Sequence, residues 1–101
     1  DTTKRFVNKV NDTLSENRII KINVIAPFAS MSKHDEINIL WQLDGNVNLL
    51  KDTLTCYNPD EQGKSCGKCP SCSERIGNFA KAGLVDPIEY SVNVPWEKII
   101  R

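Results

Sequence analysis

The first stretch of the chain places its apolar residues at the spacing of one helix face. These residues are Phe6, Val7, Val10 and Leu14. Thr2 or Thr3 precedes them and is a candidate N-cap, because a threonine hydroxyl accepts a hydrogen bond from the first free N–H groups of a helix. The pattern predicts a helix over 3–16.

A run rich in β-branched residues follows, from Ile19 to Ile25, and ends at Pro27. Its apolar character is almost continuous, which is typical of strands buried on both faces, and such strands belong to parallel sheets. We therefore expect one buried strand over 19–25.

The pattern returns to helical spacing after this run. Ser32, followed three residues later by Asp35, resembles a capping box, and an apolar stripe comes next, which we expect to be core. The stripe consists of Ile37, Leu40 and Trp41. We expect a helix over 33–43 that ends near Gly45, followed by a short helical or irregular piece.

A last helix is predicted over 70–82, where Pro70 suits the first helical position and Gly83 suits the position just after the end. A loop over 53–72 precedes it, and an extended tail over 84–101 follows, with one helical turn after Pro95. One strand cannot make a sheet alone. Either the tail supplies a partner strand, or this chain is the mostly helical trailing part of a domain whose other strands lie elsewhere, and the expected fold class is α/β.

Composition narrows the function classes. The 101 residues suggest one domain with a thin core, and 13 basic residues balance 13 acidic ones. This balance favours neither nucleic acid nor an anionic membrane as a partner. No apolar run is long enough for a membrane span, and the first residues lack the apolar core of a signal peptide, so we expect a cytoplasmic protein.

Four cysteines carry the clearest chemistry, in the spacing Cys56-x9-Cys66-x2-Cys69-x2-Cys72. A Cys-x-x-Cys turn folds two thiolates onto one ion, and four sulfurs complete the tetrahedron that Zn²⁺ prefers. Gly67 relieves the turn, and the N-terminus of the last helix favours the thiolate of Cys72. We predict one structural Zn²⁺ per chain, with no open position for an activated water.

Two other uses of the thiols remain open. Disulfides suit a secreted chain, and this one shows no secretion signal. An iron–sulfur cluster is the stronger alternative, since Cys-x-x-Cys-x-x-Cys opens the bacterial ferredoxin run, although the fourth cysteine expected soon after Cys72 does not occur.

Several unusual segments in this order resemble the 7-cyano-7-deazaguanine synthase family (QueC/ExsB-like), within the PP-loop ATP pyrophosphatases. The segments are "IAPFASMSKHDEI", "TLTCYN" and "CGKCPSCSERIGNFAKAGLVDP". The resemblance covers about 22–87 and implies the C-terminal part of an adenine-nucleotide α-hydrolase fold, with the four cysteines as zinc ligands. It also implies the conversion of 7-carboxy-7-deazaguanine, ammonia and ATP into the nitrile, by an enzyme that is often a homodimer.

The chain departs from the family in one respect: the phosphate-binding Ser-Gly-Gly-x-Asp-Ser loop does not occur in it. We therefore expect these residues to be part of a longer protein whose other part carries the PP-loop, and we expect this chain alone to hydrolyse no ATP.

Individual residues have a functional and a structural interpretation. Lys33 could contact a phosphate or the substrate carboxylate, Arg75 could do the same or brace the zinc loop, and Tyr57 could stack on a purine-like base. Thr53 and Thr55 could donate to thiolates. We expect His34 to be a solvated surface residue. Trp96 lies in the tail, which could dock on the missing half of the enzyme or on a second subunit.

Two alternative functions stay open on the sequence alone. The chain could be a freestanding zinc-ribbon-like module that binds protein or nucleic acid, although the even charge distribution does not favour this. It could also belong to a related enzyme that acts on another carboxylate.

Overall fold

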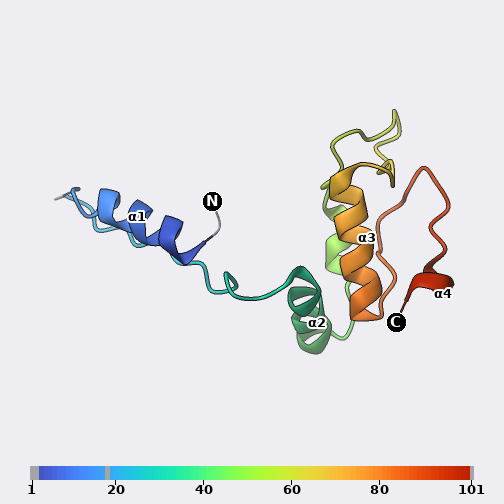
Figure 1. The fold of residues 1–101 in the computed structure, drawn as a ribbon, viewed down its shortest axis with the longest axis horizontal. Helices are drawn as coiled ribbons and strands as arrows, with labels where there is room; N and C mark the ends of the chain where they lie inside the picture. The colour runs from blue at the N-terminus through green and yellow to red at the C-terminus, as the bar shows by residue number, and fades with distance from the viewer. Residues whose placement is uncertain (1–2, 18, 101) are drawn as a thin grey trace. The chain divides into compact units, whose positions relative to one another are not determined.

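The computed structural model describes residues 3–17 and 19–100, in which the chain divides into two compact units, Asp1–Ser32 and Lys33–Arg101. Apart from one β-bridge, all regular secondary structure in the described residues is helical (Figure 1). The elements are α1 (Lys4–Leu14), α2 (Lys33–Asp44), the 3-10 helix η1 (Asn48–Asp52), α3 (Pro70–Ala82) and α4 (Trp96–Ile99). Among these residues, no helix has both the length and the apolar character needed to cross a bilayer.

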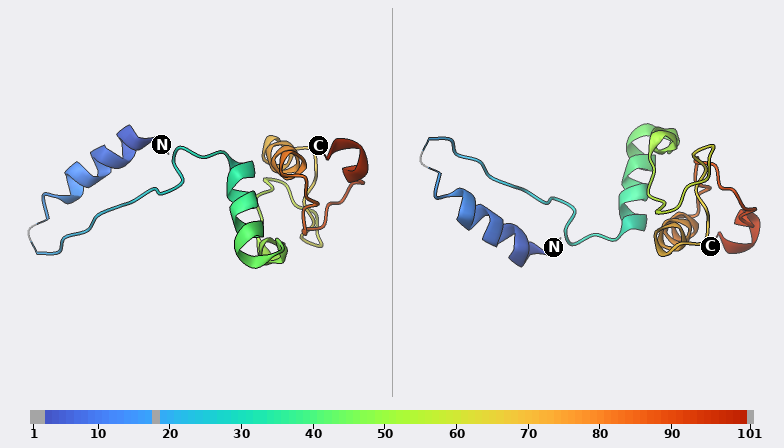
Figure 2. Two further views of the ribbon diagram at one scale, coloured as in Figure 1. Left: turned by 90° about the horizontal axis from the view of Figure 1, so that it is seen from below. Right: turned by 90° about the horizontal axis from the view of Figure 1, so that it is seen from above.

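The first unit consists of α1 and the segment that returns beside it (Figure 2). Thr3 caps α1 by accepting a hydrogen bond from the Phe6 N–H at 3.1 Å. The Asn11 side chain joins the two parts, because its amide nitrogen donates to the Val24 carbonyl at 2.9 Å and its oxygen accepts from the Val24 N–H at 2.7 Å. The Asn11 side chain thus satisfies both backbone hydrogen-bonding groups of Val24, as a neighbouring strand would do in a sheet. Thr2, the other candidate cap, lies outside the described residues.

The buried strand predicted over 19–25 is the main correction. This segment has no regular secondary structure, and all of its residues are exposed, with Ile19 at 93%. A strand needs the backbone groups of a neighbour to form a ladder, and none of the described residues supplies a ladder to 19–25. The apolar pattern is present, but the partner that would make it a strand is not.

The second unit contains the core. α2 and α3 pack against each other, and the buried residues of the described chain all lie in this unit. They are Val47, Cys56, Ser65, Cys72, Phe79, Ala80 and Asp86. Two of the seven are cysteines and two are polar, so little of this core is ordinary apolar packing.

Trp41 was expected in the core, and that prediction is wrong, since the residue is 45% exposed. Residues 36–40 of α2 are half-buried, whereas 41–44 are exposed, so the packing ends before the last turn of the helix. Periodicity grouped Trp41 with Ile37 and Leu40, but the structure covers only the latter two in part.

α3 spans the range predicted for the last helix. Pro70 occupies its first turn, and the Cys69 sulfur accepts from the Cys72 N–H at the N-terminus. At the other end Gly83 takes a left-handed conformation with φ of 75°, and the N–H of Leu84 bonds to the Phe79 carbonyl at 3.1 Å. This pattern satisfies carbonyls that the end of a helix leaves free. Both ends of α3 are therefore specified by local residues.

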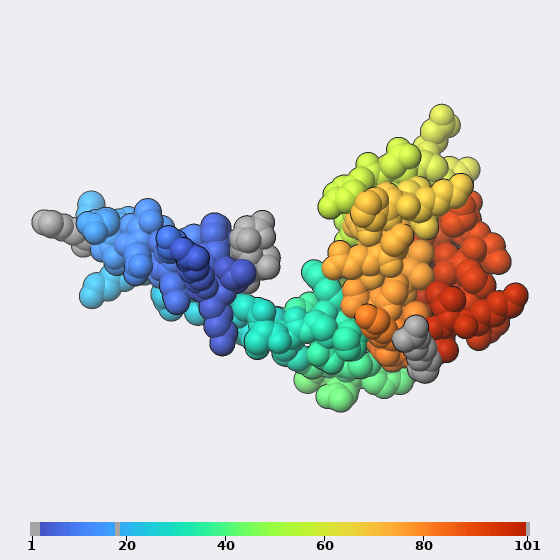
Figure 3. Space-filling model, viewed as in Figure 1, coloured from blue at the N-terminus to red at the C-terminus, as the bar shows by residue number. Residues whose placement is uncertain are grey.

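The C-terminal segment after α3 returns along the second unit and ends in α4. Figure 3 shows this segment, in red, lying along α3, in orange. It forms the only β-bridge of the described residues, a parallel one between Ser65 and Tyr90. The rings of Tyr90 and Trp96 lie 6.4 Å apart, so α4 is joined to this segment through aromatic contact.

Candidate metal centre

The structure brings all four cysteines together. Cys56 follows η1, Cys66 and Cys69 lie on the loop, and Cys72 lies in the first turn of α3. Their sulfur atoms are within 4.8 Å of one another, and all four are free thiols. The disulfide interpretation therefore does not describe this structure.

The spacing of the sulfurs fits a tetrahedral ion. With zinc–sulfur bonds of about 2.3 Å, the sulfurs of a regular tetrahedron lie about 3.8 Å apart. The Cys56 and Cys69 sulfurs are 3.9 Å apart. The four residues thus fit a metal ion coordinated only by sulfur, and such a set leaves no coordination position for water.

Backbone N–H groups surround the sulfurs. Cys56 accepts from the N–H groups of Asn58 and Cys66, at 3.2 and 3.3 Å. Cys66 accepts from those of Lys68 and Cys69, both at 3.3 Å. These bonds stabilise negative charge on sulfur and fix the direction of each ligand, as the outer contacts of a metal site generally do.

The thiols differ in acidity for physical reasons. The N–H groups of Tyr57 and Cys72 lower the pKa of Cys69 to about 6, and those of Lys68 and Cys69 lower the pKa of Cys66. Burial raises the pKa of Cys72 to about 12. The backbone N–H groups therefore favour the thiolate form of Cys69, whereas Cys72 would give up its proton on binding a cation.

The predicted contact residues fall in two places. Lys33 and Arg75 line one cavity of about 290 Å³ between α2, η1 and α3, with Ile37, Leu50 and Phe79 among its apolar residues. Tyr57 is 79% exposed and does not line this cavity. The structure thus brings two of the three candidates together and leaves the third apart.

Arg75 is engaged in bonds to the protein. Its Nε and Nη2 donate to the Asp86 carboxylate at 2.6 and 2.9 Å. Nη1 donates to the Thr53 hydroxyl at 2.9 Å and Nη2 to the Leu50 carbonyl at 3.3 Å. The guanidinium also lies 5.5 Å from the centre of the Phe79 ring. This geometry favours the bracing role over a phosphate contact, because most of its donors are used.

Thr53 and Thr55, which could have donated hydrogen bonds to thiolates, instead take part in hydrogen bonds with other groups. The Thr53 hydroxyl donates to the Leu50 carbonyl at 2.6 Å, and the Thr55 carbonyl accepts from the Ser71 hydroxyl at 2.6 Å. Both bonds hold the segment before Cys56 in place. His34 lies away from the cysteine cluster, with its Nε2 3.6 Å from the Asp35 carboxylate.

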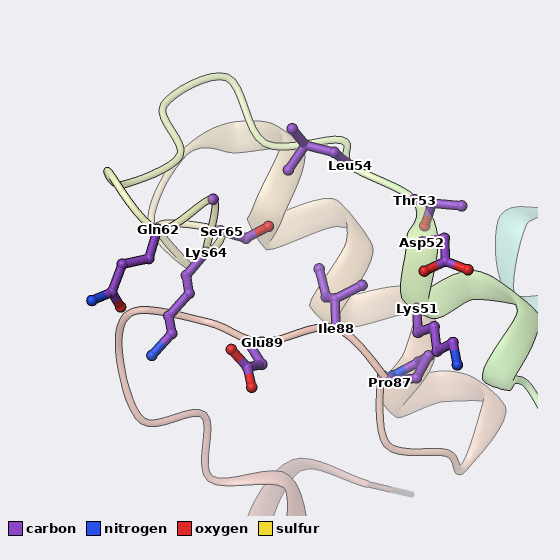
Figure 4. Close-up of a pocket in the computed structure, with 11 residues that line it drawn as sticks. Lys51, Asp52, Thr53, Leu54, Gln62, Lys64, Ser65, Pro87, Ile88 and Glu89 are labelled. Carbon is purple, nitrogen blue, oxygen red and sulfur yellow. The ribbon is translucent and has the colours of Figure 1, made fainter.

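A second, more polar groove of about 460 Å³ lies beside the loop (Figure 4). Three segments line it, 51–54, 62–65 and 87–89, and its charged residues are of both signs. They are Lys51, Asp52, Lys64 and Glu89. None of the predicted contact residues lines this groove.

Sequence reasoning assigned no role to three residues that the structure joins to the cysteine-bearing segments: Ser65, Asp86 and Tyr90. Asp86 stands in the "GLVDP" segment that carried the family resemblance, but it received no role there. A buried acid is rare unless it is paired, so an isolated Asp beside a Pro in an apolar context was the available signal.

Comparison with known proteins gives the family. The family model described as queuosine biosynthesis protein QueC matches residues 1–83. Curated relatives named 7-cyano-7-deazaguanine synthase are 35% identical over 95% of this chain in Caldicellulosiruptor bescii, 34% over 97% in Caldicellulosiruptor saccharolyticus and 37% over 89% in Pseudoalteromonas atlantica. The chain spans 41%, 41% and 39% of those relatives.

None of the solved structures matches this chain. The family model covers more than half of the chain, and relatives at this identity extend over nearly all of it. The resemblance seen in the sequence is thereby confirmed, and the chain belongs to the QueC family of queuosine biosynthesis proteins.

Proposed function

We propose that this chain is the metal-binding C-terminal part of an enzyme that forms 7-cyano-7-deazaguanine from 7-carboxy-7-deazaguanine, ammonia and ATP. The observation that carries the proposal is the family match together with the four sulfurs gathered within 4.8 Å. The relatives' name supplies the proposed product, and the chain spans 41% of the length of the first relative, which supports the proposal that it forms one part of the enzyme.

The metal is proposed to be Zn²⁺, held by Cys56, Cys66, Cys69 and Cys72. Bound there, it would supply a structural crosslink, because four sulfur ligands leave no position for a substrate. The loop that it crosslinks buries little besides its own cysteines and Ser65. A metal ion worth about 10–16 kcal/mol to folding is sufficient to hold such a loop.

Lys33 is the proposed contact for a substrate carboxylate or phosphate. It opens α2, is exposed and lines the cavity that Arg75 also borders. An ammonium group attracts an oxyanion as a point charge, so it could hold the carboxylate for adenylation and stabilise the negative charge that develops on the carbonyl oxygen when ammonia adds to the acyl adenylate. Arg75 would not contact the substrate; its hydrogen bonds to neighbouring segments would keep the residues that line the cavity in position. Tyr57 remains available to stack on a base.

The proposed reaction begins with adenylation of the carboxylate, since a carboxylate is a poor electrophile until one oxygen becomes a leaving group. Ammonia would then displace AMP and form an amide. A second ATP would adenylate the amide oxygen, which leaves with AMP while the nitrogen loses two protons, and the nitrile results. The phosphate-binding loop for ATP does not occur in this sequence. We therefore propose that this chain alone hydrolyses no ATP, and that a PP-loop part completes the enzyme.

The exposed apolar residues of the first unit are the proposed docking surface for that PP-loop part. They include Ile19, Ile20, Ile22 and Ile25, which are between 51% and 93% exposed. Apolar runs of this kind are stable when strands pair with them and cover both faces. We also propose a cytoplasmic location and assembly as a homodimer.

The test uses the full gene product that contains this chain, incubated with 7-carboxy-7-deazaguanine, ammonia and ATP. Mass spectrometry should detect the nitrile and release of pyrophosphate, and the 101-residue chain alone should release none. Lys33→Met should lower kcat/KM by about 100-fold, as loss of a single oxyanion partner does elsewhere. Lys51→Met, which alters the other groove, is the control and should retain activity. No nitrile from the full gene product would refute the proposal.

A further inference from the structure

Asp86 is the centre of a buried hydrogen-bond network after α3. Its side chain is 0% exposed and accepts four hydrogen bonds. Two come from Arg75, one from the Ile88 N–H at 3.1 Å and one from the Tyr90 hydroxyl at 2.7 Å. Every acceptor position of this carboxylate is therefore occupied, as a buried charge requires.

Arg75 carries this network to the cysteines. It lies three residues after Cys72 on α3, and it reaches Thr53 and Leu50 in the segment that leads to Cys56. Asp86 is thus joined through one guanidinium to the elements that present two of the four sulfurs. Because the Arg75 side chain is only 10% exposed, solvent cannot readily replace these bonds.

A second connection reaches the loop between these two ligands. Ser65, next to Cys66, is 2% exposed. Its N–H donates to the Glu89 carbonyl at 3.1 Å, and its carbonyl accepts from the Ser91 N–H at 2.8 Å. This bridge fixes the backbone on which the Cys66 sulfur is mounted.

The turn between Cys66 and Cys69 also lies directly against the C-terminal segment. A Cβ atom on Gly67 would be 2.5 Å from the Val92 Cγ2 atom, so a side chain at this position would require Val92 to move. Gly67 has φ of 73°, a left-handed conformation that glycine adopts without strain. The segment therefore sets the position of a turn that points at the cluster.

We propose that the C-terminal segment 86–92 is a positioning element of the metal centre, so that metal binding by the four cysteines and docking of this segment form one coupled equilibrium. This segment lies beyond residue 83, where the match to the family model ends. The inference rests on the metal binding proposed above. According to this inference, Asp86 and Tyr90 do not contact the metal. They keep the cysteines in position through Arg75 and through the loop that carries Cys66.

Coupling of this kind is reciprocal. If docking of the segment tightens metal binding by a certain factor, the metal tightens docking by the same factor. Losing an outer contact of a metal site commonly weakens metal affinity by about 10–100-fold. A variant that weakens the docking of segment 86–92 should therefore bind the metal ion less tightly, although all four cysteines are present.

The first experiment measures zinc affinity of the 101-residue chain by competition with a chromophoric chelator. Asp86→Asn should weaken zinc binding by about 10–100-fold, and Tyr90→Phe, which keeps the ring and removes one hydrogen bond, by a smaller factor. Glu89→Gln is the matched control: it lies in the same segment, its side chain is exposed, and its contribution to the Ser65 bridge comes from the backbone. It should bind zinc like the wild type.

The second experiment follows hydrogen exchange of the Ser65 and Ser91 amides in the zinc-loaded and metal-free wild type. Both amides should lose protection when zinc is removed. Equal protection in the two states, or wild-type zinc affinity in both Asp86→Asn and Tyr90→Phe, would overturn the inference and leave the proposed function standing. A wild-type chain that binds no zinc would overturn both.

Discussion

The two units of this chain contain similar kinds of apolar residues but use them differently. In the second unit, Phe79 and Ala80 are buried, and the same unit contains a buried ion pair and the four clustered thiols. In the described residues of the first unit, none is buried, although isoleucine and valine are frequent there. Apolar sequence alone did not create a core; the unit that has one also has polar groups that join its segments.

The difference has a physical origin in size. A unit of about 30 residues cannot bury enough surface to offset its conformational entropy without a metal, a disulfide or a partner. The second unit has a predicted metal site and a buried Arg75–Asp86 pair, whereas the first has one asparagine that holds Val24. Of the two units, the first therefore has fewer contacts of its own to stabilise it.

The largest effect is expected at the metal ligands. Cys72→Ser should abolish zinc binding and remove most of the stability of the second unit, since structural zinc contributes about 10–16 kcal/mol. Trp41 and Trp96 both lie in that unit, so tryptophan fluorescence reports its unfolding alone. Ser73→Ala, an exposed neighbour on the same helix, should leave the zinc content unchanged. A folded, zinc-free Cys72→Ser chain would contradict the structural role.

The same substitution in each unit tests the comparison directly. Phe79→Ala should cost about 3–5 kcal/mol, because the ring is 2% exposed and its removal leaves a cavity. Phe6→Ala, at a ring 47% exposed on α1, should cost less than about 1 kcal/mol. Urea unfolding followed by fluorescence measures the first, and amide exchange in α1 measures the second. Equal losses would mean that the first unit is better covered than the structure indicates.

A smaller effect is expected from replacing arginine by lysine. Arg75→Lys keeps the charge but loses the two-pronged contact with Asp86 and the bonds to Thr53 and Leu50. We expect a loss of about 1–3 kcal/mol in the free energy of unfolding. Arg5→Lys, at an exposed site on α1, should change it by no more than about 0.5 kcal/mol. The bracing role would be wrong if both variants matched the wild type in urea unfolding.

The smallest effect concerns alkaline pH. Burial and the neighbouring Asp86 raise the pKa of Tyr90 above its ordinary value of 10.0. Above pH 10 the unfolded chain loses this proton while the folded chain keeps it, so the contribution of Tyr90 to stability is present below pH 10 and declines as pH rises. The decline is at most about 1.4 kcal/mol per pH unit. Tyr90→Phe should show a shallower loss of stability between pH 10 and 11, whereas Tyr57→Phe, at an exposed ring, should follow the wild type.

Local features were predictable because their causes lie within a few residues. Thr3 accepts from Phe6, three residues on, and Pro70 and Gly83 stand at the two ends of α3. The four cysteines are spaced so that a short loop and one helix turn can bring their sulfurs together, and the structure places them together. The sequence by itself therefore determined both ends of α3 and the candidate ligand set, and it placed the limits of α1 and α2 to within two residues, since 3–16 and 33–43 were predicted and Lys4–Leu14 and Lys33–Asp44 are observed.

Only the tertiary structure decided which distant residues meet. Asp86 bonds to Arg75 across 11 positions of sequence and Ser65 bonds to Ser91 across 26, whereas Tyr90 bonds to Asp86 across 4. No periodicity or spacing reveals the first two contacts. The segment 19–25 carries the pattern of a buried strand, yet it stays exposed because strand formation depends on the backbone of another segment. Helix caps and ligand spacings are properties of neighbours in sequence, whereas burial and strand pairing are properties of neighbours in space.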